Sequence, residues 1–208
     1  HVPLGDIGRW DSRRATPGLV RTIGTVTFVE GPKQIVVQSA DNGARVKTLR
    51  PHEASPGDTL EFRGLPDTDG YFVGLRYASS SPSSTLLPID DPFGDEDALS
   101  RENAFRLVTL SGQFIGREGR ILNLESRGQL VPVTLPETFP PDTLPAEGSA
   151  INITGVKIVD ADERGELRSV TVMMRSQNDL VVLATPSWWT PKRYWTVMLT
   201  LAGCILLI

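Results

Sequence analysis

The last fifteen residues of this 208-residue chain set the strongest limit on how it can fold. Residues 194–208 read Tyr-Trp-Thr-Val-Met-Leu-Thr-Leu-Ala-Gly-Cys-Ile-Leu-Leu-Ile and contain no charged side chain. Leaving their large apolar side chains in water would cost about 15 kcal/mol in total, at ~1.5 kcal/mol each. That cost equals or exceeds the whole stability of a typical domain, so the segment must be buried in a protein core or in lipid.

The residues around this segment favour lipid. Aromatic rings mixed with basic side chains are typical of the boundary between membrane and water. Those expected at the membrane interface are Trp188, Trp189, Lys192, Arg193, Tyr194 and Trp195. A spanning helix needs about 20 apolar residues, so the segment is interpreted as a truncated transmembrane helix. The alternative is a C-terminal helix buried in a globular core. Charge alone leaves the orientation open, because only one flank of the helix is in the sequence.

The composition limits the classes of partner. The chain carries 25 acidic and 21 basic residues, for a net charge of −4. A nucleic-acid partner is therefore not expected, since such proteins present a basic surface. The only cysteine, Cys204, lies in the apolar tail, so no internal disulfide can form before it.

Helical periodicity is hard to find before the tail, and short runs rich in Val, Ile, Thr, Leu and Phe alternate with Gly, Pro, Asp and Asn. The predicted class is mainly β. Strands are expected at 19–28, 34–39, 44–48, 59–63, 71–78, 105–115, 120–125, 130–135, 150–159 and 167–174, and residues 180–185 lead on to the tail. The stretch between 79 and 100 is rich in Pro, Ser and Asp and loses this character.

The two halves of the β region resemble each other. Val20-Arg-Thr-Ile-Gly-Thr-Val-Thr corresponds to Val108-Thr-Leu-Ser-Gly-Gln-Phe-Ile, and three further segments match. For three of the four pairs the displacement is 88, 86 and 91 residues. A unit that recurs at nearly constant spacing predicts two copies of one small domain. Each copy offers about five strands, and its long first strand contains a glycine, Gly24 or Gly112, where a bend is expected.

A long bent first strand shared by both halves of a five-stranded barrel is the pattern of the OB-fold. An immunoglobulin-like sandwich is the rival, but it needs about seven strands per copy. The expected architecture is two tandem five-stranded OB-like barrels followed by the start of a transmembrane helix. The expected divisions are a lead-in at 1–18, a first domain at 19–88, an acidic Pro-rich linker at 89–104, a second domain at 105–185, an interfacial juncture at 186–193 and the truncated helix at 194–208.

Ligand binding on the first barrel is a candidate activity. OB-folds commonly bind on the face of strands two and three. The residues expected on that face or its rim are Gln34, Gln38, Arg45, Lys47 and Tyr71. The alternative is that the nearby aromatic residues Phe28, Phe62 and Phe72 simply fill the barrel core.

Metal and catalytic sites find little support in the residues. EF-hand counting from Asp67 or Asp160 reaches Ala78 or Thr171 where a Glu is required. The acidic cluster at residues 90–97 is the remaining calcium candidate. One cysteine and two histidines exclude Cys/His metal clusters, and His52 is expected in a solvated loop. No catalytic residue, metal or cofactor is predicted for this chain.

The juncture Pro186-Ser-Trp-Trp-Thr-Pro-Lys-Arg, with Asp179-Leu-Val-Val-Leu-Ala-Thr-Pro before it, resembles the extracytoplasmic region of bacterial membrane-bound sensor histidine kinases. The resemblance implies that residues 1–190 lie on the periplasmic side of the bacterial inner membrane. It also implies a homodimer, and a cytoplasmic kinase region that follows residue 208. The expected partners are the membrane and an unknown small ligand or envelope protein. The alternative is a membrane-anchored envelope binding or assembly module with no kinase.

Overall fold

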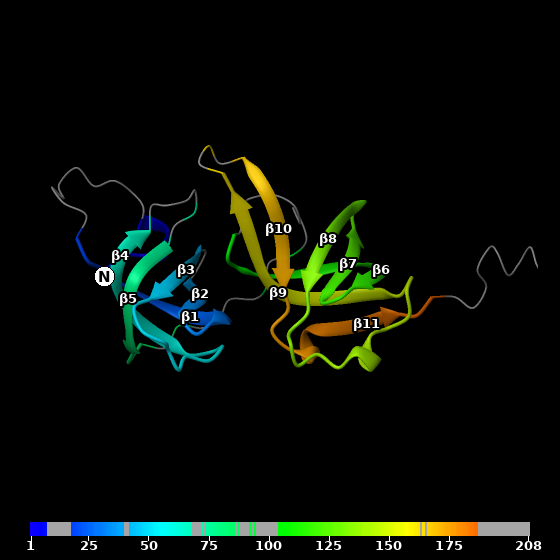
Figure 1. Ribbon diagram of the computed structural model, residues 1–208, viewed down its shortest axis with the longest axis horizontal. Helices are drawn as coiled ribbons and strands as arrows, with labels where there is room; N and C mark the ends of the chain where they lie inside the picture. The colour runs from blue at the N-terminus through cyan, green and yellow to red at the C-terminus, as the bar shows by residue number, and fades with distance from the viewer. Residues whose placement is uncertain are drawn as a thin grey trace, which may run out of the picture.

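The computed structural model describes residues 1–7, 18–39, 42–67, 72, 74–85, 87, 92, 94, 104–162, 164 and 166–186. Eleven strands and three short 3-10 turns are found in these residues, so the predicted mainly β class is confirmed. Two β units lie side by side along the long axis of the molecule (Figure 1). The last strand of the first unit ends at Pro82 and the first strand of the second begins at Leu107.

The first unit is a closed five-stranded barrel with the strand order β1-β2-β3-β5-β4. All neighbours are antiparallel except β3 and β5, which run parallel. Its strands are β1 (Val20–Gly31), β2 (Gln34–Ser39), β3 (Asn42–Thr48), β4 (Thr59–Asp67) and β5 (Gly74–Pro82). The prediction of a five-stranded barrel is confirmed for this unit.

The long first strand closes the barrel by changing partners along its length. Residues 20–25 of β1 pair with β4, whereas residues 25–31 pair with β2. The change falls beside Gly24, where the bend was predicted. In the second unit the same change falls beside Gly112, and a Cβ there would lie 2.3 Å from the carbonyl oxygen of Glu125. A side chain at Gly112 would therefore force the neighbouring strand away.

The second unit is a six-stranded sheet with the order β10-β8-β7-β6-β9-β11 and an additional pairing between β9 and β10. The β8–β10 pair is parallel. Its strands are β6 (Leu107–Glu118), β7 (Ile121–Ser126), β8 (Gln129–Thr134), β9 (Ala150–Ala161), β10 (Leu167–Met173) and β11 (Leu180–Ala184). β9 and β10 form a long hairpin that rises above the rest of the unit in Figure 1.

Equivalent backbone hydrogen bonds recur in the two units. The N–H of Gly57 donates to Val26 O and the N–H of Gly148 to Phe114 O, at 2.8 and 2.7 Å. Both glycines have positive φ, +101° and +86°, which glycine adopts without strain. The repeat read from the sequence therefore corresponds to repeated local structure.

Each unit has its own hydrophobic core. In the first, Phe62 is fully buried among aliphatic residues of all five strands, and Leu4 and Ile7 of the N-terminal segment join them. In the second, Phe114, Leu122 and Leu124 are buried with residues of β8, β9 and β10. The lead-in therefore contributes to the first core, with its 3-10 turn η1 (Leu4–Asp6).

A third and smaller cluster joins the two units. Its buried members are Val36 of the first unit and Phe105, Leu107 and Val156 of the second, and Phe28 and Phe72 pack against them. The expectation that Phe28 and Phe72 fill the barrel core is thus wrong. They pack in the cluster between the units instead, where Phe28 lies on the outer face of β1 and Phe72 contacts the Phe105 ring.

The predicted transmembrane helix at 194–208 falls outside the described residues. Within the described part of the chain, no helix has the length and apolar character needed to cross a bilayer.

Candidate functional site

The residues predicted to bind a ligand lie on the outer face of β2 and β3. Ile35 and Val37 of β2 point into the core, so Gln34 and Gln38 point away from it. Arg45 and Lys47 alternate in the same way with Ala44 and Val46 on β3. Four of the five predicted residues therefore share one face, while Tyr71 lies outside the described residues.

The charged residues of this face are already paired within the first unit. Arg45 Nε lies 3.1 Å from Glu30 Oε2, and its Nη2 donates to Glu30 Oε1 at 3.2 Å. Gln34 Nε2 also donates to the Glu30 carboxylate. Lys47 Nζ lies 2.9 Å from Asp67 Oδ2. These contacts fix the side chains in place, and a ligand would have to compete with them.

The second unit covers much of the same face. The backbone N–H of Leu107 donates to Gln38 Oε1 at 3.0 Å, and Gln38 is only 3% exposed. The Phe105 ring lies under the Arg45 guanidinium, 5.0 Å from its carbon to the ring centroid. Phe72 meets the same ring edge-on, with centroids 5.5 Å apart. The sequence-predicted ligand face is therefore, in this structure, a contact between the two units.

This contact depends on unusual backbone geometry. A Cβ at Gly43 would lie 2.1 Å from the Phe105 carbonyl oxygen, so only glycine permits the approach. Phe105 itself has φ +60°, which is uncommon and unfavourable for a bulky residue. The sequence contains no pattern that predicts either feature, since both depend on how the units meet.

A cleft of about 750 Å³ opens beside this contact and is bordered by both units. The first unit contributes the β1–β2 hairpin, including Phe28 and Glu30. The second contributes Arg120, at the β6–β7 turn, with Met173 and Arg175. The cleft combines apolar surface with charged groups of both signs, as ligand sites commonly do. Sequence reasoning missed it because its residues are far apart in the chain.

The basic groups of the cleft are held by acidic partners. Arg120 Nη1 lies 3.0 Å from Glu137 Oε1, and Arg120 also donates to the Leu135 carbonyl oxygen. The Glu137 side chain is 84% exposed, so this ion pair contributes little stability and is open to competition.

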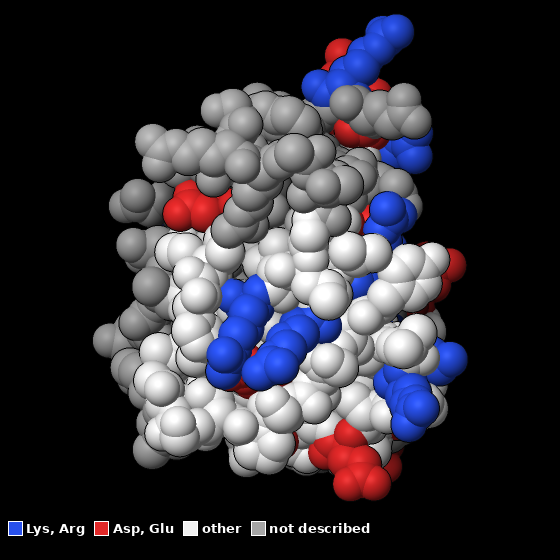
Figure 2. All heavy atoms as spheres, turned by 90° about the vertical axis from the view of Figure 1, so that its left-hand side faces the viewer, with Lys and Arg blue, Asp and Glu red and all other residues white. Residues whose placement is uncertain are grey.

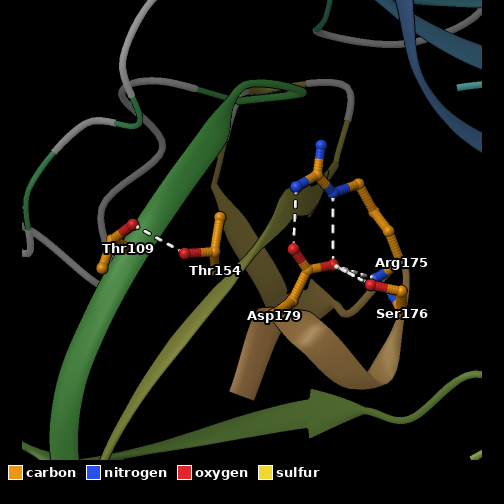
Figure 3. Close-up of polar contacts among 5 residues, drawn as sticks. All are labelled: Thr109, Thr154, Arg175, Ser176 and Asp179. Atoms are coloured by element: carbon orange, nitrogen blue, oxygen red, sulfur yellow. Dashed lines mark hydrogen bonds and ion pairs between the residues drawn. The ribbon is translucent and has the colours of Figure 1, made fainter. Parts of the chain in front are cut away.

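Arg175 is held more firmly, as Figure 3 shows. Its Nε and Nη2 donate to the Asp179 carboxylate at 3.3 and 2.8 Å, the fork-like geometry typical of strong arginine pairs. Asp179 also accepts from the backbone N–H of Ser176 at 3.0 Å and completes a capping box around the 3-10 turn η3 (Gln177–Asp179). Thr109 and Thr154, in the same figure, join β6 to β9 through hydroxyls 3.0 Å apart. The Arg175–Asp179 contacts and the capping box fix the turn that leads into β11 at Leu180.

A separate charged cluster lies on the other side of the first barrel. Figure 2, which faces this end of the molecule, shows basic side chains gathered close to acidic ones. Arg21 and Arg63 are direct cross-strand neighbours on β1 and β4, and both contact the Glu61 carboxylate. The hydrogen bond from Arg21 holds the pKa of Glu61 below its usual range and raises the pKa of Arg21. Mutual charge pairing accounts for the cluster.

His52 is half-buried rather than fully solvated. Its Nε2 lies 2.9 Å from the Gly31 carbonyl oxygen, and its backbone N–H donates to Pro32 O at 3.0 Å. These contacts tie the loop after β3 to the β1–β2 hairpin. Among the described residues its Nδ1 has no hydrogen-bond partner, and no nucleophile is paired with the ring.

No group of three or more His, Cys, Asp or Glu in the described ranges is arranged to hold a metal ion. Asp67 pairs with Lys47, and Asp162 accepts from the backbone N–H groups of Arg164 and Glu166, at 2.9 and 2.8 Å, as a turn residue does. Most of the acidic segment at 90–97 lies outside the described residues.

The predicted membrane-interface residues also lie outside the described part of the chain. They are Trp188, Trp189, Lys192, Arg193, Tyr194 and Trp195.

Comparison with known proteins adds no identification. No protein-family model and no curated protein matches the chain. A solved structure described as "structural mimicry for functional antagonism" is similar with a TM-score of 0.34 and 8% identity, over 82% of this chain and 97% of the other. A multidomain protein with nucleic acid binding domains from Streptococcus pneumoniae is similar with a TM-score of 0.23 and 14% identity, over 76% of this chain and 46% of the other. Neither likeness is strong enough to support an argument about function.

Proposed function

We propose that this chain is the extracytoplasmic sensing region of a membrane-bound bacterial signal-transduction protein, of the sensor histidine kinase class that residues 186–193 resemble. The observation that carries the proposal is the cleft bordered by both units. A ligand in that cleft contacts both units at once. It can therefore favour one arrangement of the units over another, as coupling requires. The ligand is a small molecule or an envelope protein.

The proposed architecture is a tandem of two OB-like barrels. The strand order of the first barrel, with its parallel β3–β5 pair, supports an OB-like fold. In the second unit the pairings β6–β7, β7–β8, β8–β10, β10–β9 and β9–β6 follow the same order. β11 has no counterpart in the first unit, and it directly precedes the juncture at residues 186–193.

A continuous element runs from the contact between the units toward the juncture. Val156 of β9 belongs to the cluster between the units, whereas residues 150–153 of the same strand pair with β11. β11 ends at Ala184, two residues before Pro186. A shift of the first unit against β9 would therefore be transmitted along one paired strand to the start of the juncture. The juncture and residues 194–208 would anchor the protein in the inner membrane, as part of a homodimer, with residues 1–190 in the periplasm.

The first experiment tests this placement. In the intact protein with Cys204→Ser, a cysteine introduced at the exposed Ser81 is treated with a membrane-impermeant maleimide in cells with a permeabilised outer membrane. We expect labelling without lysis of the inner membrane. Labelling only after lysis would place the first barrel in the cytoplasm and contradict the proposal.

The second experiment tests the juncture. Replacing Trp188 and Trp189 with Ala should change the signalling output of the intact protein while both β units stay folded. A double variant with normal output would remove the role assigned to this segment.

A second candidate function is a membrane-anchored envelope binding or assembly module. It is favoured by β11, an edge strand whose Val181, Val182 and Leu183 are 53%, 43% and 59% exposed. An exposed apolar edge can accept a strand from another protein. A Val182→Lys substitution separates the two functions. It should abolish assembly in an envelope complex if this alternative holds, and leave ligand-dependent signalling intact if the sensing proposal holds.

A further inference from the structure

We propose that the outer face of β2 and β3 is a binding site for a peptide segment with the pattern Phe-x-Leu, and that residues 104–107 of the chain itself occupy it in this structure. The inference goes beyond the sensing role and does not depend on it, because it concerns only which chemistry this face recognises.

The site recognises an aromatic ring from two sides. The Phe105 ring is 3% exposed, with the Arg45 guanidinium carbon 5.0 Å from its centroid and the Phe72 ring in a T-shaped contact whose centroids lie 5.5 Å apart. A cation above the ring face and an aromatic edge beside it both favour a ring over an aliphatic side chain. Glu30 holds Arg45 in position from the opposite side.

The second recognition element lies two residues further on. Leu107 is 4% exposed against the fully buried Val36, and its backbone N–H donates to Gln38 Oε1 at 3.0 Å. A side-chain amide that accepts a hydrogen bond from a backbone N–H recognises the peptide backbone and not a particular side chain. The pattern that fits is therefore an aromatic residue, any residue, and an aliphatic residue.

The internal segment is not bound in an ideal way. Phe105 has φ +60°, and its backbone N–H also donates to Lys157 O of β9 at 2.7 Å. Gln38 Nε2 is buried and has no hydrogen-bond partner among the described residues. A free peptide need not adopt the positive φ of Phe105, and one of its carbonyl oxygens can accept a hydrogen bond from Gln38 Nε2. It can therefore compete with the internal segment, which keeps the advantage of being tethered.

The test measures binding of the synthetic peptide acetyl-Ala-Phe-Arg-Leu-amide, labelled with a fluorophore, to the full chain in detergent solution. In the Phe105→Ala variant the internal ring no longer competes, so we expect at least tenfold tighter binding than to wild type. A peptide with Ala in place of Phe should bind neither protein. Adding Arg45→Ala to Phe105→Ala should weaken peptide binding about tenfold or more.

Tyr77→Ala provides a matched control. Tyr77 is also an aromatic residue with positive φ, +52°, beside an arginine, but it is 62% exposed on β5 and absent from the cluster between the units. This variant should bind the peptide as wild type does. If Phe105→Ala does not fold, Phe105→Leu takes its place with the same expected gain.

Equal peptide affinity of wild type and a folded Phe105 variant, or no binding to either, would overturn the proposal. A spin-label distance between Ser81→Cys and Gln129→Cys, in a Cys204→Ser background, gives an independent readout. In wild type, saturating peptide should broaden the distribution of this distance. An unchanged distribution would show that residues 104–107 are not displaced.

Discussion

The guanidinium of Arg45 lies 5.0 Å from the centroid of the Phe105 ring, and this pair links the first β unit to the second. The same arginine also forms an ion pair with Glu30, which lines the adjacent cleft. The contact between the units and the cleft are therefore linked by one ion pair, Arg45–Glu30. Binding in the cleft that attracts Glu30 or Arg45 would also change how Phe105 is held.

Gly43 should be required for the contact between the units. In a Gly43→Ala variant the new Cβ would meet the Phe105 carbonyl oxygen, so residues 104–107 should leave the face and the Leu107 amide should lose protection from hydrogen exchange. Gly31→Ala is the matched control, because a Cβ there meets nothing within 4 Å. Equal protection of Leu107 in both variants would contradict the described approach.

The two cores should respond separately to truncation. Phe62→Ala should destabilise the first unit by about 3–5 kcal/mol, and Leu124→Ala the second by about 2–5 kcal/mol, since both side chains are fully buried. Differential scanning calorimetry should show each substitution lowering mainly one transition. If both substitutions lower a single shared transition equally, the units fold as one cooperative body.

Asp179 should control the ordering of β11. Asp179→Ala removes the acceptor for Arg175 and for the Ser176 backbone N–H, and loss of such a charged cap costs about 1–3 kcal/mol. Hydrogen exchange should accelerate in β11 and its partner residues of β9. The control is Glu137→Ala, which removes an exposed partner of Arg120 and should change stability by less than about 0.5 kcal/mol.

The Arg21–Glu61 pair should make stability depend on pH in the acid range. The pKa of Glu61 is lowered in the folded state by the hydrogen bond from Arg21. Its contribution is therefore complete above the ordinary Glu value of about 4.3 and is lost as the pH falls through the lower folded pKa. Glu61→Gln should have a lower Tm than wild type at neutral pH, and the difference should shrink under acid. If the difference in Tm between Glu61→Gln and wild type stays constant with pH, the loss of stability comes from packing and not from the ion pair.

Much of the fold follows from local sequence patterns. All ten predicted strands form within a few residues of their expected positions, because alternating β-branched residues and turn residues act locally, whereas β11 was not predicted as a strand. The change of partner beside Gly24 and Gly112 lies where a bend was predicted, because a glycine inside a long strand usually marks a bend or a bulge. The 3-10 turns were not predicted, nor was the continuation of β6 to Glu118, where residues 116–118 pair with residues 121–123 across the tight turn into β7.

The candidate site was less accessible to such reasoning. Gln38 and Arg45 were assigned to the correct face from the alternation along β2 and β3. That this face would be covered by Phe105 and Leu107 could not be read from the sequence, because it depends on how two separately folded units meet. The cleft residues Arg120 and Arg175 were missed for the same reason. A lone arginine near a turn carries no local signal of a shared cleft.

The most direct test of the sensing account is the signalling output of the intact protein in cells carrying Phe105→Ala, compared with wild type and Tyr77→Ala. Because Phe105 holds the units together, its loss should shift basal output several-fold, while Tyr77→Ala leaves output at the wild-type level. Wild-type output from a stably folded Phe105→Ala protein would contradict the claim that the packing of the two units carries the signal.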